Sequence, residues 1–251
     1  MWYPRSRHDG GRNLKVEDKK CCLLIGNSRW HWAIERNDAW HYFHTNADPQ
    51  KLSVLEIPLV SWAAVGPIPK NASLNPTKRL TVKDVPLKKL PHWVGIDRAL
   101  ASWGALKKAE FTEINSCGLL IADAGTVLSV NRITENGEFA GGQLIPGLRL
   151  QLEAMATGAH NLNNPGFSLS TQELFPFKTD EAMQRGSIQA LIGTLIEAIN
   201  ETNTPLWLCG GDAPVLIKEL KKRNKNVFHH PNLVLEGMVD IQHQINQEQD
   251  L

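Results

Sequence analysis

Short apolar runs that end at a glycine occur twice along the chain and predict buried strands followed by tight turns. Residues 21–25, CCLLI, lead into Gly26, after which aromatic and polar positions alternate from Trp30. A second run, GLLIA at 118–122, leads through Asp123 to Gly125 and a returning apolar stretch. Buried strands read as continuous apolar runs and half-buried strands as alternation, so both stretches predict strand, turn and strand. Their similarity predicts a duplicated α/β architecture.

Apolar residues spaced three or four apart predict helices at four further places. Such stripes more often face a core than a ligand, so we assign them to packing. The four stripes are Leu100, Trp103 and Leu106; Leu148, Leu152, Met155, Ala159 and Leu162; Ile188, Leu191, Leu195 and Ile199; and Leu216 with Leu220.

Polar residues predict where two of these helices begin and end. Thr179 is a candidate N-cap, with Asp180 and Glu181 placed where the positive end of the helix dipole favours acidic groups. The basic run 218–225 falls at the carbonyl end of the last helix, which favours a solvated helix end over a nucleic-acid patch.

The predicted organisation has three parts. Residues 1–20 form a polar extension, residues 21–113 a first domain and residues 114–251 a second domain. Two proline-containing stretches, Pro58–Pro76 and Pro165–Pro176, are predicted to be surface loops.

Composition narrows the function classes. The chain has 251 residues and a net charge of +1, with 42% hydrophobic and 21% charged residues. This balance is typical of a globular protein and provides no field for binding nucleic acid or an anionic membrane. No apolar run approaches the ~18 residues of a membrane span, and residues 1–20 contain no apolar signal segment.

Cysteine and histidine usage adds two expectations. Cys21, Cys22, Cys117 and Cys209 form no CxxC pair and lie in or beside apolar runs, which predicts buried free thiols in a reducing, cytoplasmic compartment. The close histidine pairs at 41 and 44 and at 229 and 230 raise the possibility of zinc. However, no carboxylate or thiol is spaced to join them, so we assign them to a half-exposed strand and a loop.

Glycine turns and one acidic-basic pair are the candidate chemistry. Turns at 25–28 (IGNS), 124–126 (AGT) and 209–212 (CGGD) follow apolar runs and could bring backbone N–H groups to an anion. In residues 95–98, GIDR, Asp97 could act as a base while Arg98 holds an anionic substrate. From spacing alone, an N-cap role for Asp97 with a solvated Arg98 is equally compatible.

Six segments together resemble the type III pantothenate kinases. They match in order and spacing over about residues 22–238, and GxDR, DxGT and GGxxxPGL are specific in combination. The resemblance implies an actin-like fold of two ribonuclease H-like domains facing an ATP cleft, and a homodimer formed largely through the second domain. The segments are GIDR (95–98), DAGT (123–126), GGQLIPGL (141–148), TDEAMQRG (179–186), CGGDA (209–213) and PNLVLEGM (231–238).

The resemblance also implies roles for individual residues. Asp97 is similar to the base that accepts the proton of the pantothenate hydroxyl, and Asp123 to the ligand of a monovalent cation, K⁺ or NH₄⁺. The implied pantothenate-binding residues are Gly95, Ile96, Asp97, Arg98 and Thr179, the last near the dimer interface. The implied ATP-binding residues are Gly26, Asn27, Ser28, Thr126, Gly210 and Gly211. The expected activity is Mg²⁺- and ATP-dependent phosphorylation of pantothenate to 4′-phosphopantothenate, the first step towards coenzyme A.

Three positions depart from the family pattern. Leu24 replaces the aspartate of the first phosphate loop and cannot hold hydrated magnesium. Lys88 stands where a substrate-contacting tyrosine is usual, and Asn131 stands where the second strand usually ends in aspartate. Two alternatives therefore stay open: a ligand-binding or regulatory relative without activity, and an actin-like kinase for another small hydroxyl compound.

Overall fold

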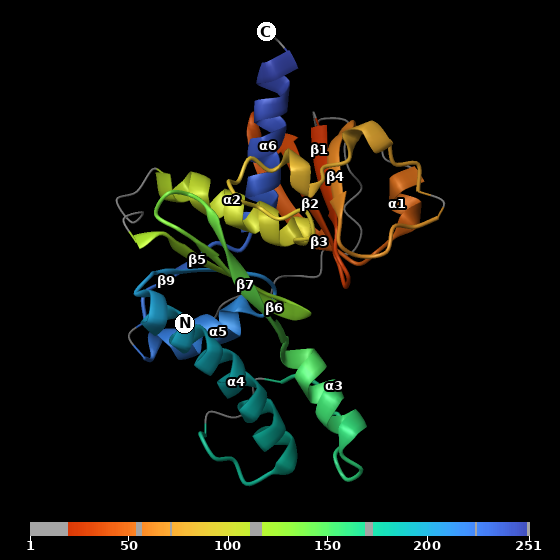
Figure 1. Cartoon of the computed structure of the whole chain (residues 1–251). Coiled ribbons are helices and arrows are strands. Elements are labelled where there is room, and N and C mark those ends of the chain that lie inside the picture. Colours follow the sequence, from red (N-terminus) through yellow and green to blue (C-terminus); the bar gives the residue numbers. More distant parts are fainter. Residues whose placement is uncertain are drawn as a thin grey trace. The chain divides into compact units, whose positions relative to one another are not determined.

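The computed structural model describes residues 20–53, 57–70, 72–110, 117–168, 173–223 and 225–249. These residues form two compact units, each with its own sheet (Figure 1). The first contains the described residues up to Thr81 together with those from Gln242 onward, and the second runs from Val82 to Ile241.

The first unit is built on a four-stranded sheet with strand order β3-β2-β1-β4. Strands β1, β2 and β3 are antiparallel neighbours, whereas β4 runs parallel to β1. Cys21, Leu23, Ile25, Trp30 and Trp32 belong to the buried cluster on one face of the sheet. The elements are β1 (Lys20–Ile25), β2 (Trp30–Arg36), β3 (Ala39–Thr45), α1 (Pro49–Ser53), β4 (Leu59–Ala64) and the 3₁₀ turn η1 (Pro76–Lys78).

The second unit is built on a five-stranded sheet with strand order β7-β6-β5-β8-β9. Strands β5, β6 and β7 are antiparallel neighbours, and β8 and β9 continue the sheet in parallel. The elements are η2 (Val82–Asp84), α2 (Ile96–Glu110), β5 (Leu119–Ala124), β6 (Val127–Ile133), β7 (Phe139–Pro146), α3 (Leu148–Gly158), α4 (Thr179–Thr202), β8 (Leu206–Cys209), α5 (Ala213–Lys221), β9 (Val227–His229) and α6 (Leu233–Gln249), whose end from Gln242 belongs to the first unit.

Both sheets share one topology, because the first four strands of each are ordered 3-2-1-4 with the fourth parallel to the first. Strand β1 therefore corresponds to β5, and β4 corresponds to β8. This confirms the predicted duplication of the strand-turn-strand opening.

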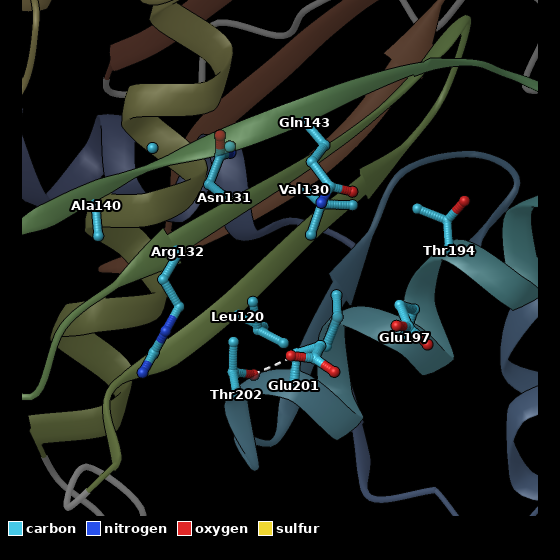
Figure 2. Close-up of a pocket in the computed structure, with 13 residues that line it drawn as sticks. Leu120, Val130, Asn131, Arg132, Ala140, Gln143, Thr194, Glu197, Glu201 and Thr202 are labelled. Atoms are coloured by element: carbon cyan, nitrogen blue, oxygen red, sulfur yellow. Dashed lines mark hydrogen bonds between the residues drawn. The ribbon is translucent and has the colours of Figure 1, made fainter.

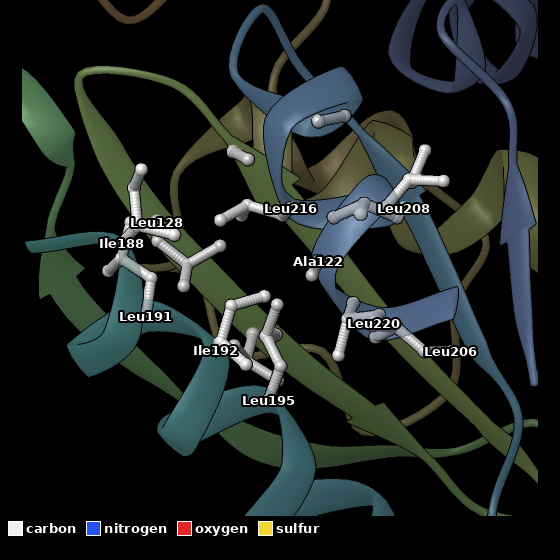
Figure 3. Packing of buried hydrophobic residues seen from close by; sticks show 14 of the residues in the cluster. Ala122, Leu128, Ile188, Leu191, Ile192, Leu195, Leu206, Leu208, Leu216 and Leu220 are labelled. Atoms are coloured by element: carbon white, nitrogen blue, oxygen red, sulfur yellow. The ribbon is translucent and has the colours of Figure 1, made fainter. Parts of the chain in front are cut away.

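Helices α4 and α5 supply the core on one face of the five-stranded sheet (Figure 3). Leu128 of β6 and Leu208 of β8 are fully buried there, together with Leu195 of α4 and Leu216 of α5. Burial of a leucine side chain contributes about 1.5–3 kcal/mol, so this layer is a major source of stability for the unit. Because side chains alternate along a strand, Asp123 and Asn131 lie on the opposite face.

The opposite face is covered by α2, which also packs tightly on α6. Gly104 and Gly237 leave no room for a Cβ atom between the two helix backbones. Trp103 of α2 donates its indole N–H to Asp240 of α6 at 2.7 Å, and Lys108 pairs with Glu236 at 3.2 Å. These contacts hold α2, whose first turn carries Asp97 and Arg98, against α6.

Several local predictions need correction. Strand β4 lies within Pro58–Pro76, which was predicted to be a loop. The N-cap of α4 is Lys178, and Thr179 is the first helical residue, although Asp180 and Glu181 occupy the first turn as predicted. Cys117 is exposed, whereas Cys21, Cys22 and Cys209 are buried free thiols as expected.

Two further predictions concern where a helix and a domain end, and part of them lies outside the described residues. The apolar stripe from Leu148 to Leu162 is helical only to Gly158. Compact packing divides the chain at Thr81, whereas the predicted domain boundary at 113 and most of the polar extension lie outside the described residues. No helix in the described ranges combines the length and apolarity needed to cross a membrane.

Candidate functional site

Asp97 and Arg98 lie in the first turn of α2. The helix begins at Ile96, and the carbonyl of Gly95 accepts a hydrogen bond from the Ala99 N–H at 3.1 Å. The Asp97 Oδ1 atom accepts from the backbone N–H of Arg98 at 2.8 Å. Burial raises the pKa of Asp97, against the opposing effects of the Arg98 N–H and guanidinium. A carboxylate with a raised pKa is a better proton acceptor once ionised.

The Arg98 guanidinium is held by Asn131 of β6. Its Nε and Nη2 atoms donate to the Asn131 Oδ1 atom at 2.9 Å and 2.6 Å. Asn131 has no exposed surface, and Arg98 keeps a partly exposed one. The cation is therefore fixed in one orientation beside Asp97.

Asp123 lies near the end of β5, opposite Ser129 of β6 and Cys209 of β8. The pKa of Asp123 is raised to about 7, chiefly by burial and also by the nearby Asp97 charge, against the opposing effect of a hydrogen bond with Cys209. Burial and the Asp123 charge also raise the pKa of the Cys209 thiol, which stays protonated. The Asp123 carboxylate forms no ion pair with another residue in the described part of the chain, so a bound cation would stabilise its charged form.

The third glycine turn, which follows β8, packs against Asp123. Gly210 has φ +92°, and a Cβ there would collide with the Ala124 carbonyl and the Asp123 Oδ1 atom. Asp212 donates its N–H to the Ala124 carbonyl at 2.9 Å, which ties the turn after β8 to the end of β5. Only glycine permits this close approach.

The turn after β5 carries Gly125 and Thr126 with exposed or partly exposed surfaces. The Thr126 carbonyl accepts from the Gly147 N–H at 3.0 Å, which links this turn to the start of α3. The second unit thus brings together Asp97, Arg98, Asp123, Thr126 and the Gly210–Gly211 turn through α2, β5, β6 and β8.

The first unit contains the corresponding turn at Gly26, Asn27 and Ser28. Asn27 and Ser28 are exposed, and Gly26 donates its N–H to the Arg29 carbonyl at 3.0 Å. After β4, Gly66 approaches the Gly26 carbonyl so closely that a Cβ would collide with it. Gly66 therefore packs against the end of β1 in the same way as Gly210 packs against the end of β5. The sequence did not indicate this role for Gly66, because residues 58–76, which contain β4, were predicted to be a loop.

Leu24 is buried, with 4% of its surface exposed, and lies opposite His31 of β2 and Ala63 of β4. The Nδ1 atoms of His31 and His44 lie 2.8 Å apart across β2 and β3. The pKa of His31 is lowered to about 4, chiefly by burial and also by the neighbouring His44 and Arg29 charges. The pair is thus neutral near pH 7.

Thr179 is not brought to the Asp97 group. It is exposed at the first residue of α4, and no interaction in the described part of the chain joins it to Asp97. Its predicted role in substrate binding depends on a partner subunit and stays a prediction.

A separate pocket of about 510 Å³ lies between α4 and strands β6 and β7 (Figure 2). Glu197, Glu201 and Thr194 of α4 face Gln143 and Val130 across it. The Arg132 guanidinium donates to the backbone carbonyls of Cys117, Leu119 and Ile133. None of the predicted site residues lines this pocket.

Comparison with known proteins decides the family. A family model described as type III pantothenate kinase matches residues 77–201. The type III pantothenate kinase of Synechococcus elongatus is 30% identical over 242 residues, covering 86% of this chain and 93% of the relative. The chain belongs to the type III pantothenate kinase family. The family member from Nitrosomonas eutropha is 27% identical, with 91% of this chain and 96% of that protein covered.

Solved structures show the fold. A Baf family protein from Campylobacter jejuni, described as a transcriptional activator, has a TM-score of 0.60 at 21% identity, with 92% of this chain and 100% of that chain covered. A protein from Sinorhizobium meliloti named as a 2-dehydro-3-deoxygalactonokinase has a TM-score of 0.55 at 12% identity, with 90% and 96% covered. The predicted α/β fold of the actin-like class is confirmed.

Proposed function

We propose that the chain is an ATP-dependent kinase that phosphorylates pantothenate to 4′-phosphopantothenate. The observation that carries the proposal is the Asp97–Arg98 pair: a partly buried carboxylate beside a guanidinium fixed by Asn131. Phosphoryl transfer to an alcohol depends chiefly on positioning and on neutralising phosphate charge. The family membership supports pantothenate as the alcohol.

Each site residue has a role in this proposal. Asp97 accepts the proton of the hydroxyl as the oxygen attacks the terminal phosphate, and Arg98 binds the carboxylate of pantothenate. The backbone N–H groups of the turns at Gly26, Thr126 and Gly210 bind the nucleotide. Asn27, Ser28 and Thr126 add side-chain donors.

A monovalent cation, K⁺ or NH₄⁺, fits Asp123. The carboxylate is partly buried on β5 with no salt bridge among the described residues, and the backbone at Gly210 approaches its Oδ1 atom closely. When bound, the cation supplies positive charge near the phosphates. Asp123 and the Gly210–Gly211 turn would hold it.

Magnesium does not fit position 24. Leu24 offers no ligand atom, and the neighbouring His31 imidazole is a poor ligand for a hard cation that prefers oxygen. We therefore assign Mg²⁺ to the phosphates of ATP and its own waters, with no carboxylate of the first turn.

We also propose a homodimer, which apolar side chains exposed on the second unit support. Phe175 and Phe177 are 85% and 102% exposed just before α4, and Leu144 on β7 is 61% exposed. Large apolar side chains exposed in a single chain favour an interaction site, and a second copy of the chain is a self-complementary partner. Thr179, the first residue of α4, lies just after these phenylalanines.

Leu24 favours one second candidate, a relative that binds the ligands without turnover. A coupled assay of ADP release distinguishes the candidate functions, with pantothenate and a panel of other small hydroxyl compounds as acceptors. We expect release only with pantothenate. Release with another acceptor indicates a different kinase, and pantothenate binding without release indicates the inactive relative.

A further inference from the structure

Two histidines of the first unit are linked to each other beside the Gly26–Ser28 turn. The Nδ1 atoms of His31 on β2 and His44 on β3 lie 2.8 Å apart, and the rings meet edge to face with centroids 4.8 Å apart. The other ring nitrogen of His31, Nε2, lies beside the turn, because a Cβ atom placed on Gly26 would be 3.1 Å from it. The His31 ring therefore connects His44 to the first turn.

A hydrogen bond between two Nδ1 atoms determines where each ring carries its proton. Both rings are neutral near pH 7, so each has one N–H donor and one acceptor nitrogen. One Nδ1 atom must donate and the other must accept. If His44 donates, the proton of His31 is on Nε2 and faces the turn. If His31 donates, its Nε2 atom is an acceptor.

The charges around the pair favour the first arrangement. The charge of Arg29 acts on the pKa of both histidines, and no carboxylate among the described residues contributes to either pKa. Leu24, the neighbour of His31 on β1, has a side chain without donor or acceptor. A site with positive charge and no carboxylate attracts an anion, and an N–H group binds an anion where a bare ring nitrogen cannot.

The second unit has the opposite chemistry at the equivalent place. There Asp123 of β5 pairs with Ser129 of β6, as Leu24 pairs with His31 in the first unit. The carboxylate of the second unit suits a cation, whereas the first unit offers an imidazole. Because a hard cation prefers oxygen ligands, the imidazole suits a phosphate oxygen better than magnesium.

We propose that His31 is a nucleotide-contacting residue: its Nε2–H donates to a phosphate oxygen of the nucleotide at the Gly26–Ser28 turn, and His44 is the positioning residue that fixes this tautomer. The inference rests on the proposed function for the presence of the nucleotide at this turn. It gives the first turn a direct contact with phosphate at the place where Leu24 provides no carboxylate.

Amide side chains distinguish the two nitrogens of His31, because the amide nitrogen of glutamine reaches the place of Nε2 and that of asparagine the place of Nδ1. Calorimetry gives the dissociation constants of ATP and of adenosine, which lacks phosphate. His31→Asn and His31→Leu should weaken ATP binding about 10- to 100-fold, as expected for loss of a hydrogen bond to a charged group. Adenosine binding should not change, and His31→Gln should keep most of the ATP affinity.

Variants of His44 test the positioning role. His44→Phe removes the Nδ1–H donor and should weaken ATP binding less than His31→Leu, because His31 then keeps its ring but not its fixed tautomer. In His44→Asn the amide nitrogen can replace the Nδ1–H, so this variant should bind ATP as the wild type does. His41→Gln, an exposed histidine on the same strand, is the control.

The tautomers can also be observed directly in the free protein. Long-range ¹⁵N–¹H NMR spectra of the histidine rings, assigned with the variants, should show His31 protonated at Nε2 and His44 protonated at Nδ1. Thermal unfolding of each variant checks the fold.

Equal losses for ATP and adenosine, or the same loss in His31→Gln as in His31→Asn, would overturn the inference, because a structural role depends neither on phosphate nor on which nitrogen is replaced. Protonation of His31 at Nδ1, or failure of the wild type to bind ATP, would overturn it as well. The expected pattern of ATP binding without product would contradict the kinase activity and leave the role of His31 supported. Normal product formation with unchanged ATP affinity in His31→Leu would do the reverse.

Discussion

Leu24 and Asp123 occupy equivalent positions in the two sheets. Each lies two residues before the glycine that follows the first strand of its sheet, Gly26 after β1 and Gly125 after β5. Each also pairs with the parallel fourth strand, Leu24 with Ala63 and Asp123 with Cys209. The duplicated architecture thus presents a carboxylate at this place in the second unit and an aliphatic side chain in the first.

Leu24→Asp should lower the melting temperature, because position 24 is 4% exposed and faces a neutral His31. A buried polar group without a hydrogen bond costs about 1–3 kcal/mol, and a buried charge costs more. Each kcal/mol corresponds to roughly 2–4 °C of Tm for a chain of this size. Mg-ATP should narrow the difference if the new carboxylate reaches hydrated magnesium.

Leu24→Asn is the matched control, since it is polar without charge and should not respond to magnesium. Unchanged stability together with an unchanged magnesium titration in Leu24→Asp would show that this turn is not a phosphate loop.

Replacing potassium by sodium should sharply reduce activity, because Asp123 needs a bound cation to balance a charge that burial disfavours. Potassium should also raise the Tm of the wild type, and this gain should vanish in Asp123→Asn. If neither the rate nor the Tm depends on the monovalent ion, Asp123 does not bind a cation and its role is limited to the hydrogen bond with Cys209.

Stability should fall as the pH is lowered from 6.5 to 4 through the titration of His31. Its pKa in the folded chain is about 4, below the ordinary value of 6.5. The unfolded chain therefore takes up the proton first, and the stability present above pH 6.5 is lost as the pH falls through 4.

His31→Gln removes this titration, so between pH 7 and pH 4.5 its Tm should fall less than the Tm of the wild type. The two falls should differ by about 2–4 °C for each kcal/mol that the His31 titration contributes to the free energy of unfolding. His41→Gln, an exposed histidine on β3, is the control and should follow the wild type. Identical acid profiles for His31→Gln and wild type would refute the assignment.

The protein should be a homodimer at micromolar concentration. Phe177→Ser should weaken the dimer, because that side chain is fully exposed in a single chain. Trp93→Ser, which removes another exposed aromatic from a different loop, is the control. Sedimentation that gives only the 28.0 kDa species for the wild type would contradict the prediction.

Much of the second unit follows from local pattern. The run 118–130 predicted β5, its turn and β6 because the apolar residues are continuous and the turn contains glycine. Strand β4 was missed because prolines flank it, although LVSWAA is itself a buried run ending near Gly66. Proline excludes a residue from the ladder only at its own position, so flanking prolines do not exclude a strand.

The candidate site was predictable in its residues and less so in its contacts. GIDR and DAGT identified Asp97, Arg98 and Asp123, whose side chains the fold brings to one face. The hold of Asn131 on Arg98 joins residues 33 apart in the sequence, and the Asp123–Cys209 contact joins two strands that are far apart in the chain. Such pairings depend on sheet register, which no local spacing encodes.

The most direct test of the account is product formation by wild type and Asp97→Asn with pantothenate, Mg-ATP and potassium, followed by mass spectrometry. Asp97→Asn keeps the shape of the side chain but cannot accept the proton, and loss of a general base costs on the order of 10²- to 10⁴-fold in rate. The account predicts 4′-phosphopantothenate from the wild type, and a loss of that size in the variant with ATP binding retained. No product from the wild type, or wild-type turnover by Asp97→Asn, would contradict it.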